Sequence, residues 1–386
     1  MVYEQPRWRF ARMTRAEINQ DPVQGEFFSR EADLPGRLVR EAVQNSLDAR
    51  RDPDQPVRVR FVFSGERDAL PPGRAKPYLE GLQQHVEAVA AAGGMSGSFS
   101  GGDEDDESEA LYDALSCFEK PLTYLVVEDF GTTGLTGDIL RNSEREPGND
   151  FWGFFRSIGI SPKGEDAAGS WGLGKWVFPD ASIINAYLGM TQRQGEDNWL
   201  LMGMALLKTH HIGENKHRYY GSFAAHSEEP DELWFPLPVE SDDFVQETVG
   251  DFNLERLEDP GLSVIVPFPK DELKPAEIAR AVLTQYFLPI VRGDLAVEIV
   301  HPEEGNRTIS ADTISAEVGH IEQSNRDDES AESLRSVIEL ASWAIGASAD
   351  AHVELPVRNL GDRMVERADL TELRERYARG ERLAFA

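Results

Sequence analysis

Residues 38–49, LVREAVQNSLDA, predict a helix with one polar and one apolar face. At about 100° per residue, Glu41, Asn45 and Asp48 fall within a narrow arc, because positions i, i+4 and i+7 share one side of a helix. Two valines and a leucine take the opposite side, which can bury against a sheet. A general base, a neutral oxygen ligand and a second carboxylate in one stripe suit a magnesium-bound phosphate group. An amphipathic surface helix with its polar side in water is the alternative that this segment alone leaves open.

A second motif follows the apolar run LTYLVV at residues 122–127, which is typical of a buried strand. Asp129 stands at the end of this run, and Gly131 and Gly134 follow it in the sequence EDFGTTGLTG. The carboxylate is an acceptor beside backbone that can approach a ligand closely, and an adenine amino group is a donor that it can read. Alone, the same pattern describes any glycine-rich turn from a strand into a loop.

A third motif, GSWGLGK, places Gly169, Gly172 and Gly174 in front of Lys175. Such glycines leave backbone N–H groups free to point at phosphate oxygens, and the lysine adds a positive charge. The run satisfies most of a P-loop, but Trp176 stands where the hydroxyl ligand of magnesium belongs. The preceding SPKGEDAA is not a buried strand either, so the sequence argues against a P-loop.

Taken together, the three motifs resemble those of the GHKL ATPase superfamily, which includes gyrase B, MutL mismatch-repair proteins, large heat-shock chaperones, MORC proteins and histidine kinases. The resemblance covers about residues 25–270 and has most in common with the MORC-like and chaperone-like branches, including prokaryotic relatives near restriction and phage-defence genes. It implies an α+β fold, a two-layer α/β sandwich of Bergerat type. In that fold a mixed, mostly antiparallel sheet is covered by helices, and here a smaller C-terminal α/β region would follow. The matching positions are Glu41-xxx-Asn45-xx-Asp48-Ala49, Asp129-x-Gly131-xx-Gly134 and Gly169-xx-Gly172-x-Gly174.

The resemblance also implies a role for each matching residue, with ATP and Mg²⁺ as the bound groups. Glu41 would be the general base that activates the attacking water, and Asn45 would coordinate the magnesium ion. Asp48 would line the nucleotide pocket, and Asp129 would accept the adenine amino hydrogen. Gly131 and Gly134 would shape the turn beside adenine. The three glycines of the third motif would form a lid over the triphosphate, with the lysine after them as a phosphate contact.

Two positions depart from the family pattern. The turn after Asp129 is one residue longer than usual, because Thr132 and Thr133 both precede Gly134. The late Gly-Thr motif of the family corresponds to GLSVIVPF, where a leucine takes the threonine position and Ser263 lies one residue further on. Ser263 is therefore the candidate for the hydroxyl that holds a water molecule between Asp129 and adenine.

The function that the resemblance implies is slow, magnesium-dependent ATP hydrolysis by a nucleotide-gated clamp. Such a clamp closes as an ATP-dependent homodimer and acts on partner protein subunits or DNA, with antiviral defence as one setting. An ATP sensor without turnover is an alternative, since no lysine follows Lys274 to reach the γ-phosphate from a second domain. A histidine-kinase catalytic domain is the other alternative, although none of the eight histidines stands in a helical His-Glu pattern.

The amino-acid composition limits the binding partners that the chain can have. The chain has 386 residues, with 39 Lys and Arg against 69 Asp and Glu, a formal net charge of -30. This excess repels nucleic acid phosphates and anionic membranes, so we expect DNA contact only indirectly or through a local patch. The single cysteine, Cys117, excludes an internal disulfide, fits a reducing cytosol and is expected to be a small buried residue. No apolar run approaches about 18 residues, which predicts a cytoplasmic protein without a membrane span.

Three regions are expected along the chain. Residues 1–30 form an arm whose aromatic side chains must cover either this domain or a second copy: Trp8, Phe10, Phe27 and Phe28. Residues 31–270 form the ATP-binding domain, with a disordered acidic insert near 93–109. Residues 271–386 form a helical or mixed region that resembles the start of a transducer-type domain. The apolar ending LAFA, without a polar tail, indicates a piece of a longer protein.

Local patterns predict the remaining elements. Residues 57–63, VRVRFVF, alternate apolar and basic side chains and indicate a strand with one wet face. A helix is expected to open near Tyr78, and His210 with His211 favours a polar hairpin over a metal pair. Further strands are expected at ASIINAYLGM, WLLMGMALL, YYGSFAA, LSVIVPF and LAVEIV, and helices at residues 275–291, 329–346 and 364–384.

Overall fold

The structure is a computed structural model with two compact units. It describes residues 5–14, 16–17, 33–91, 113–141, 148–157, 176–231, 233–256, 259–324, 329–347, 352–353, 370–380 and 384–385. The first unit comprises Met1–Gln285 with Leu295–Thr308, and the second comprises Tyr286–Asp294 with Ile309–Ala386. None of the described helices is both long and apolar enough to cross a membrane.

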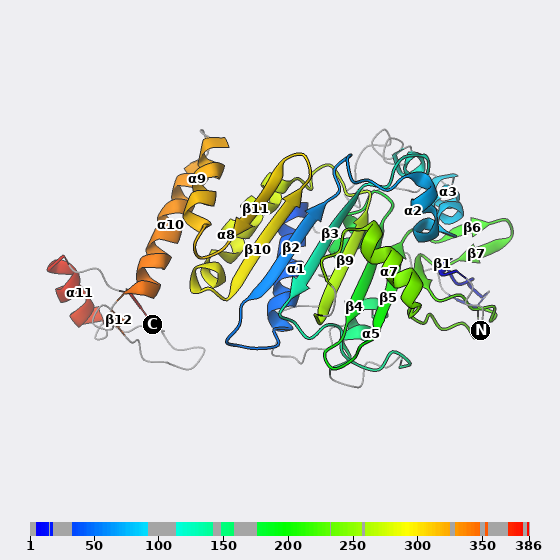
Figure 1. Ribbon diagram of the computed structural model, residues 1–386, viewed down its shortest axis with the longest axis horizontal. Coiled ribbons are helices and arrows are strands. Elements are labelled where there is room, and N and C mark those ends of the chain that lie inside the picture. The colour runs from blue at the N-terminus through cyan, green and yellow to red at the C-terminus, as the bar shows by residue number, and fades with distance from the viewer. Residues whose placement is uncertain are drawn as a thin grey trace. The chain divides into compact units, whose positions relative to one another are not determined.

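A mixed sheet of nine strands, in the order β1-β8-β5-β4-β9-β3-β2-β10-β11, is the framework of the first unit (Figure 1). The strands are β1 (Arg7–Arg9), β2 (Val57–Phe63), β3 (Tyr124–Phe130), β4 (Ala186–Gln192), β5 (Trp199–Leu206), β8 (Tyr220–Ala224), β9 (Gly261–Pro267), β10 (Leu295–His301) and β11 (Gly305–Ile309). Most neighbouring pairs are antiparallel, whereas β10 runs parallel to β2. The α+β class and the mostly antiparallel sheet with its helices are confirmed.

The central strands are buried because both faces of the sheet are covered. Every residue of β3 is buried, as its apolar sequence predicted. The prediction of a wet face on β2 is wrong. Its Arg60 is only 9% exposed and forms an ion pair with Glu128 of β3 at 2.8 Å, so this side chain faces a covered network, and Arg58 is half-buried.

Helix α1 (Leu34–Asp48) lies behind the sheet in Figure 1, and α7 (Asp242–Asp251) lies in front of it. Of the predicted apolar face of α1, Val39 and Val43 are fully buried and Leu47 is half-buried; Leu38 is fully buried as well. The helix begins four residues before the quoted stretch because Asp33 caps it, with its Oδ1 accepting the Gly36 N–H at 2.8 Å.

The single helix predicted near Tyr78 is two helices, α2 (Pro72–Leu79) and α3 (Gln83–Ala91). Gly81 separates them with a φ of +86°, a conformation that L side chains rarely adopt. A Cβ at this position would lie 2.5 Å from the carbonyl oxygen of Trp8. The break therefore follows from the close approach of the N-terminal strand.

The N-terminal arm joins the sheet of its own chain, since β1 pairs antiparallel with β8. Trp8 is 3% exposed and donates its indole N–H to the carbonyl of Tyr78 at 2.8 Å, and Phe10 is 2% exposed. These two aromatics cover this domain, while exchange of the arm between protomers stays a prediction. Phe27, Phe28 and the acidic insert near 93–109 lie outside the described residues.

The predicted polar hairpin is confirmed by β6 (His210–Ile212) and β7 (Asn215–His217), which pair antiparallel. Two of its histidines are buried with one from α3. His85 Nδ1 lies 2.7 Å from His210 Nε2, and His217 Nδ1 donates to the carbonyl of Phe10 at 2.9 Å. The ring of Phe10 stacks on that of His85, so this histidine cluster (His85, His210, His217) holds the end of the arm.

The first unit extends past the predicted boundary at residue 270. Helix α8 (Pro275–Arg292) begins in this unit, and β10 then pairs with β2, so the sheet is incomplete without residues beyond 270. In the second unit, α9 (Ile314–Ser324) and α10 (Glu329–Gly346) are followed by α11 (Leu370–Ala378), which ends before the predicted end at residue 384. The predicted start at residue 364 lies outside the described residues. The strands β12 (His352–Val353) and β13 (Ala384–Phe385), which the sequence did not predict, pair in parallel.

Cys117 lies in the short 3₁₀ turn Cys117–Glu119 and is 4% exposed. Burial raises the pKa of its thiol to about 12, so the thiol stays protonated at neutral pH. It is the small buried residue that the sequence predicted.

Candidate active site

Helix α1 presents Glu41 and Asn45 side by side. Asn45 Nδ2 donates to Glu41 Oε1 at 2.8 Å, and both side chains are half-buried. With its nitrogen on Glu41, Asn45 has its amide oxygen left as the atom that suits a hard cation. The negative charge of Glu41 also acts on buried Tyr187 of β4, where it adds to burial in raising the pKa of that phenol. The predicted shared face thus brings Glu41 and Asn45 into contact, while their roles as base and cation ligand stay predictions.

Asp48, the third member of the predicted stripe, is exposed at the last position of α1. Its Oδ1 accepts a hydrogen bond from Gln44 Nε2 at 2.9 Å. The structure therefore places the Asp48 carboxylate toward solvent. Ser46, two positions earlier on α1, is only 3% exposed and turns toward the sheet.

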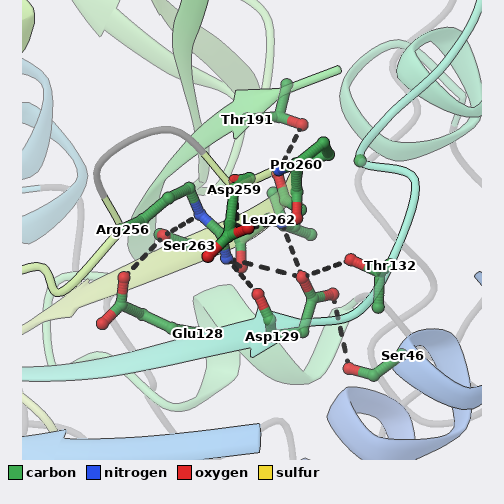
Figure 2. A network of polar contacts seen from close by, with 12 residues as sticks. Ser46, Glu128, Asp129, Thr132, Thr191, Arg256, Asp259, Pro260, Leu262 and Ser263 are labelled. Atoms are coloured by element: carbon green, nitrogen blue, oxygen red, sulfur yellow. Dashed lines mark hydrogen bonds and ion pairs between the residues drawn. The ribbon is translucent and has the colours of Figure 1, made fainter. Parts of the chain in front are cut away.

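Asp129 lies near the end of β3 at the centre of a polar network (Figure 2). Its Oδ1 accepts the backbone N–H of Leu262 at 2.7 Å and the hydroxyl of Thr132 at 2.8 Å. Its Oδ2 faces α1, where the Ser46 hydroxyl lies 3.4 Å away. The contact of Ser46 joins the first sequence motif to the second.

A fully buried arginine, Arg256, completes this network. It follows α7, and its Nη2 lies 3.5 Å from Asp129 Oδ1 while also donating to the carbonyl oxygen of Asp129. Its guanidinium lies over the ring of Phe130, 4.7 Å from the centroid. Burial raises the pKa of Asp129 above its usual range, although Arg256, Leu262, Thr132 and Ser46 all oppose the shift. Burial likewise lowers the pKa of Arg256, against the pull of nearby carboxylates.

The turn after β3 is tied to the end of α1. Thr133 N–H donates to the carbonyl of Ala49 at 3.0 Å, and Arg51 N–H donates to the carbonyl of Gly131 at 2.9 Å. Gly131 and Gly134 have φ values of +80° and +71°. A Cβ on Gly134 would lie 2.1 Å from the carbonyl oxygen of Gln192, so no larger residue fits there without a shift of the backbone. Both glycines therefore shape this turn, while its place beside adenine stays a prediction.

Ser263 does not face Asp129. Its hydroxyl donates to Glu128 Oε1 at 3.0 Å and accepts from Arg256 Nε at 3.2 Å. Alternation along β9 explains this, since Ser263 stands opposite Glu128 in the ladder and the side chain of Asp129 points to the other face. The group from β9 that reaches Asp129 is the backbone N–H of Leu262.

The third motif, Gly169, Gly172, Gly174 and Lys175, lies outside the described residues. The element that follows it, α6 (Val177–Asp180), is anchored to the site's own helix. Asp180 accepts from Arg37 of α1 and from Lys270 after β9, both at 2.8 Å. Arg37 precedes Glu41 by one helical turn, so α6 is bonded to α1 one turn away from the predicted base.

Sequence reasoning missed Ser46, Thr132 and Arg256. Ser46 lies inside the first motif but off the chosen stripe, and Thr132 was counted only as an extra residue in the turn. Arg256 had no sequence signal, because its carboxylate partner is 127 positions away in the chain.

No protein-family model and no curated protein sequence matches this chain. The interpretation of the site therefore depends on the motifs and on the contacts described above.

Proposed function

We propose that this chain binds ATP with magnesium and hydrolyses it slowly as a nucleotide-gated, dimerising clamp. The observation that carries the proposal is the contact between Ser46 and Asp129. Through it, the helix that carries the Glu41–Asn45 pair contacts the carboxylate that would read adenine. A base, a cation ligand and an acceptor for an amino group are the three elements that the resemblance requires.

In this proposal each residue acts at a stated atom. Asp129 Oδ2 would accept the adenine amino hydrogen, and Asn45 Oδ1 is the atom that would hold the magnesium ion. Bound magnesium would neutralise charge on the phosphate oxygens. Glu41 takes the proton from the attacking water, and its hydrogen bond from Asn45 holds the carboxylate in one orientation. Phosphate contacts would come from the third motif.

Closure of two copies on ATP would operate the clamp, and hydrolysis would reopen it. Its proposed clients are partner protein subunits, with DNA held indirectly because the net charge of -30 disfavours direct binding. Restriction or phage defence in the cytoplasm is the setting that the resemblance suggests. A sensor that binds ATP without turnover is the second candidate, because Lys270 is bonded to Asp180 and no lysine follows Lys274.

Magnesium-dependent ATP hydrolysis, measured over a range of protein concentrations, tests the proposal. We expect turnover per molecule to rise with concentration, because closure needs two copies, and to vanish in Glu41→Ala while ATP binding persists. Glu277→Ala, an exposed carboxylate on α8, is the matched control and should hydrolyse like the wild type. ATP binding without turnover in the wild type supports the sensor, phosphohistidine formation supports phosphotransfer, and no ATP binding contradicts the motif assignment.

A further inference from the structure

Arg256 is a fully enclosed charged side chain of the candidate site, with 0% of its surface exposed. Nη1 donates to the carbonyls of Asp259 and Pro260 at 3.0 and 2.9 Å, and Nη2 donates to that of Leu262 at 3.1 Å. Three carbonyl contacts within residues 259–262 fix the path of the loop that enters β9 (Figure 2). Holding that loop also holds the Leu262 N–H that donates to Asp129 Oδ1.

The buried charges of this region pair off, and Arg256 is the partner of Asp129. Glu128, on the neighbouring position of β3, has its own partner in Arg60 at 2.8 Å. Among the described residues, Arg256 is the one cation paired with Asp129. The other groups that donate to Asp129, such as the Thr132 hydroxyl and the Leu262 N–H, are neutral. A buried carboxylate that loses its cation takes up a proton or destabilises the fold.

The donors to Asp129 are unevenly divided between its two oxygens. Leu262, Thr132 and Arg256 all approach Oδ1. Within the described part of the chain, the Ser46 hydroxyl is the one donor to Oδ2, at 3.4 Å, and it also donates to the carbonyl of Ala42 at 2.8 Å. Oδ2 therefore keeps acceptor capacity on the side that faces α1.

We propose that Arg256 is a positioning residue for the nucleotide base. It fixes the loop of residues 259–262 and balances the charge of Asp129, so that Oδ1 is held by the protein and Oδ2 stays an ionised acceptor for an exocyclic amino group. Adenine carries such an amino group on C6, whereas guanine carries a carbonyl oxygen on the same ring carbon. The inference rests on the proposed nucleotide binding and adds to it the residue that orients the reading carboxylate.

If Arg256 only stabilised the fold, its substitution would lower the free energy of unfolding and would not change the pH dependence of nucleotide binding. A positioning role predicts more, because Asp129 without its cation is protonated at a higher pH than in the wild type. The other charged groups around the pair are Glu128 on β3, Asp259 in the loop and Arg58 on β2. All three remain in an Arg256 variant, so the change in pH dependence reports on the missing guanidinium.

The test is calorimetric titration of the full chain with magnesium-ADP from pH 5.5 to 9, in wild type, Arg256→Gln and Arg256→Lys. We expect Arg256→Gln to bind at least about tenfold more weakly at pH 7 and to recover affinity relative to the wild type as pH rises. Arg256→Lys keeps the charge but cannot hold three carbonyls, so its affinity should fall without a change in pH dependence. If Arg256→Gln does not fold, the lysine variant decides, and wild-type affinity in it overturns the proposal.

Arg58→Gln is the matched control. Its guanidinium also lies over the ring of Phe130, 3.9 Å from the centroid, but its ion pairs go to Glu255 and Glu298 and not to Asp129. We expect its binding and pH dependence to match the wild type. A wild-type chain that does not bind magnesium-ADP would contradict the proposed function itself. Wild-type binding with an identical pH profile in Arg256→Gln would contradict this inference alone.

Discussion

Ser46 has one hydroxyl hydrogen and two acceptors within reach. The shorter contact, to the carbonyl of Ala42, is a bond within α1, and the longer one reaches Asp129 Oδ2. A ligand donor that arrives at Oδ2 can replace the longer contact while the shorter one persists. The site thus exchanges a weak internal bond for a ligand bond without leaving a buried donor unsatisfied.

The turn after β3 depends on Gly134 for both conformation and space. Gly134→Ala should lower the free energy of unfolding by more than about 2 kcal/mol, because a left-handed φ and a clash with the Gln192 carbonyl add together. Denaturant unfolding measures the change. Gly195→Ala is the control, since Gly195 has a φ of +81° in open space and should lose only about 1 kcal/mol. Equal losses in the two variants would show that the close approach to Gln192 is not limiting.

Three elements meet at the histidine cluster: α3, the β6–β7 hairpin and the end of the N-terminal arm. Burial, and then the neighbouring His210 and His217, lower the pKa of His85 from 6.5 to about 3. Burial also lowers the pKa of His210. A protonated His85 and a protonated His210 cannot share the hydrogen bond between their rings, so both lose this contact in acid.

The sign of the pH dependence follows from that lowered pKa. Below pH 6.5 the unfolded chain binds a proton at position 85 that the folded chain excludes down to about pH 3. The free energy of unfolding therefore decreases as the pH is lowered through this window. From His85 alone the decrease is about 2 kcal/mol between pH 6.5 and pH 5. Stability measured against pH should show a shallower slope in His85→Asn than in the wild type. His211→Asn, on the exposed side of the hairpin, should keep the wild-type slope, and an unchanged slope in His85→Asn would contradict the prediction.

Elements with a strong local signal were predictable, and those set by distant contacts were not. The strand at residues 57–63 was predicted with its observed bounds because its side chains alternate between apolar and basic, which is the local pattern of a strand. The division of the helix near Tyr78 was missed because Gly81 breaks it only where Trp8 approaches, 73 positions away in the chain. The burial of Arg60 was missed for the same reason, since its partner Glu128 comes from another strand.

At the scale of the whole molecule, the sheet needs a strand from beyond residue 285. We expect residues 1–308 to unfold cooperatively and residues 1–270 to aggregate. The shorter piece loses α8 and leaves β2, whose Val57, Val59 and Phe61 are fully buried, as an exposed edge. Size-exclusion chromatography and thermal unfolding of the two pieces test this. Equal solubility and melting temperature would mean that β10 adds nothing to the sheet.

The connection that produces this parallel pair was beyond sequence reasoning. The run LAVEIV was predicted as a strand, but its partner was not, because the pattern of a strand does not encode which edge of a sheet it joins. The α+β class was an expectation from the resemblance of the three motifs, and the shared face of Glu41 and Asn45 followed from helical periodicity. The orientation of Ser263 and the counter-charge from Arg256 depend on register between strands, which only the folded chain defines.

The buried thiol of Cys117 has a practical consequence for following this protein in solution. As the single cysteine of the chain, with its pKa raised to about 12, it offers maleimide or iodoacetamide reagents almost no thiolate at neutral pH. A cysteine introduced at an exposed position such as Leu140 would therefore take a fluorophore or spin label alone, without removal of the native residue. Distances between two such labels on separate copies would then report nucleotide-dependent pairing directly.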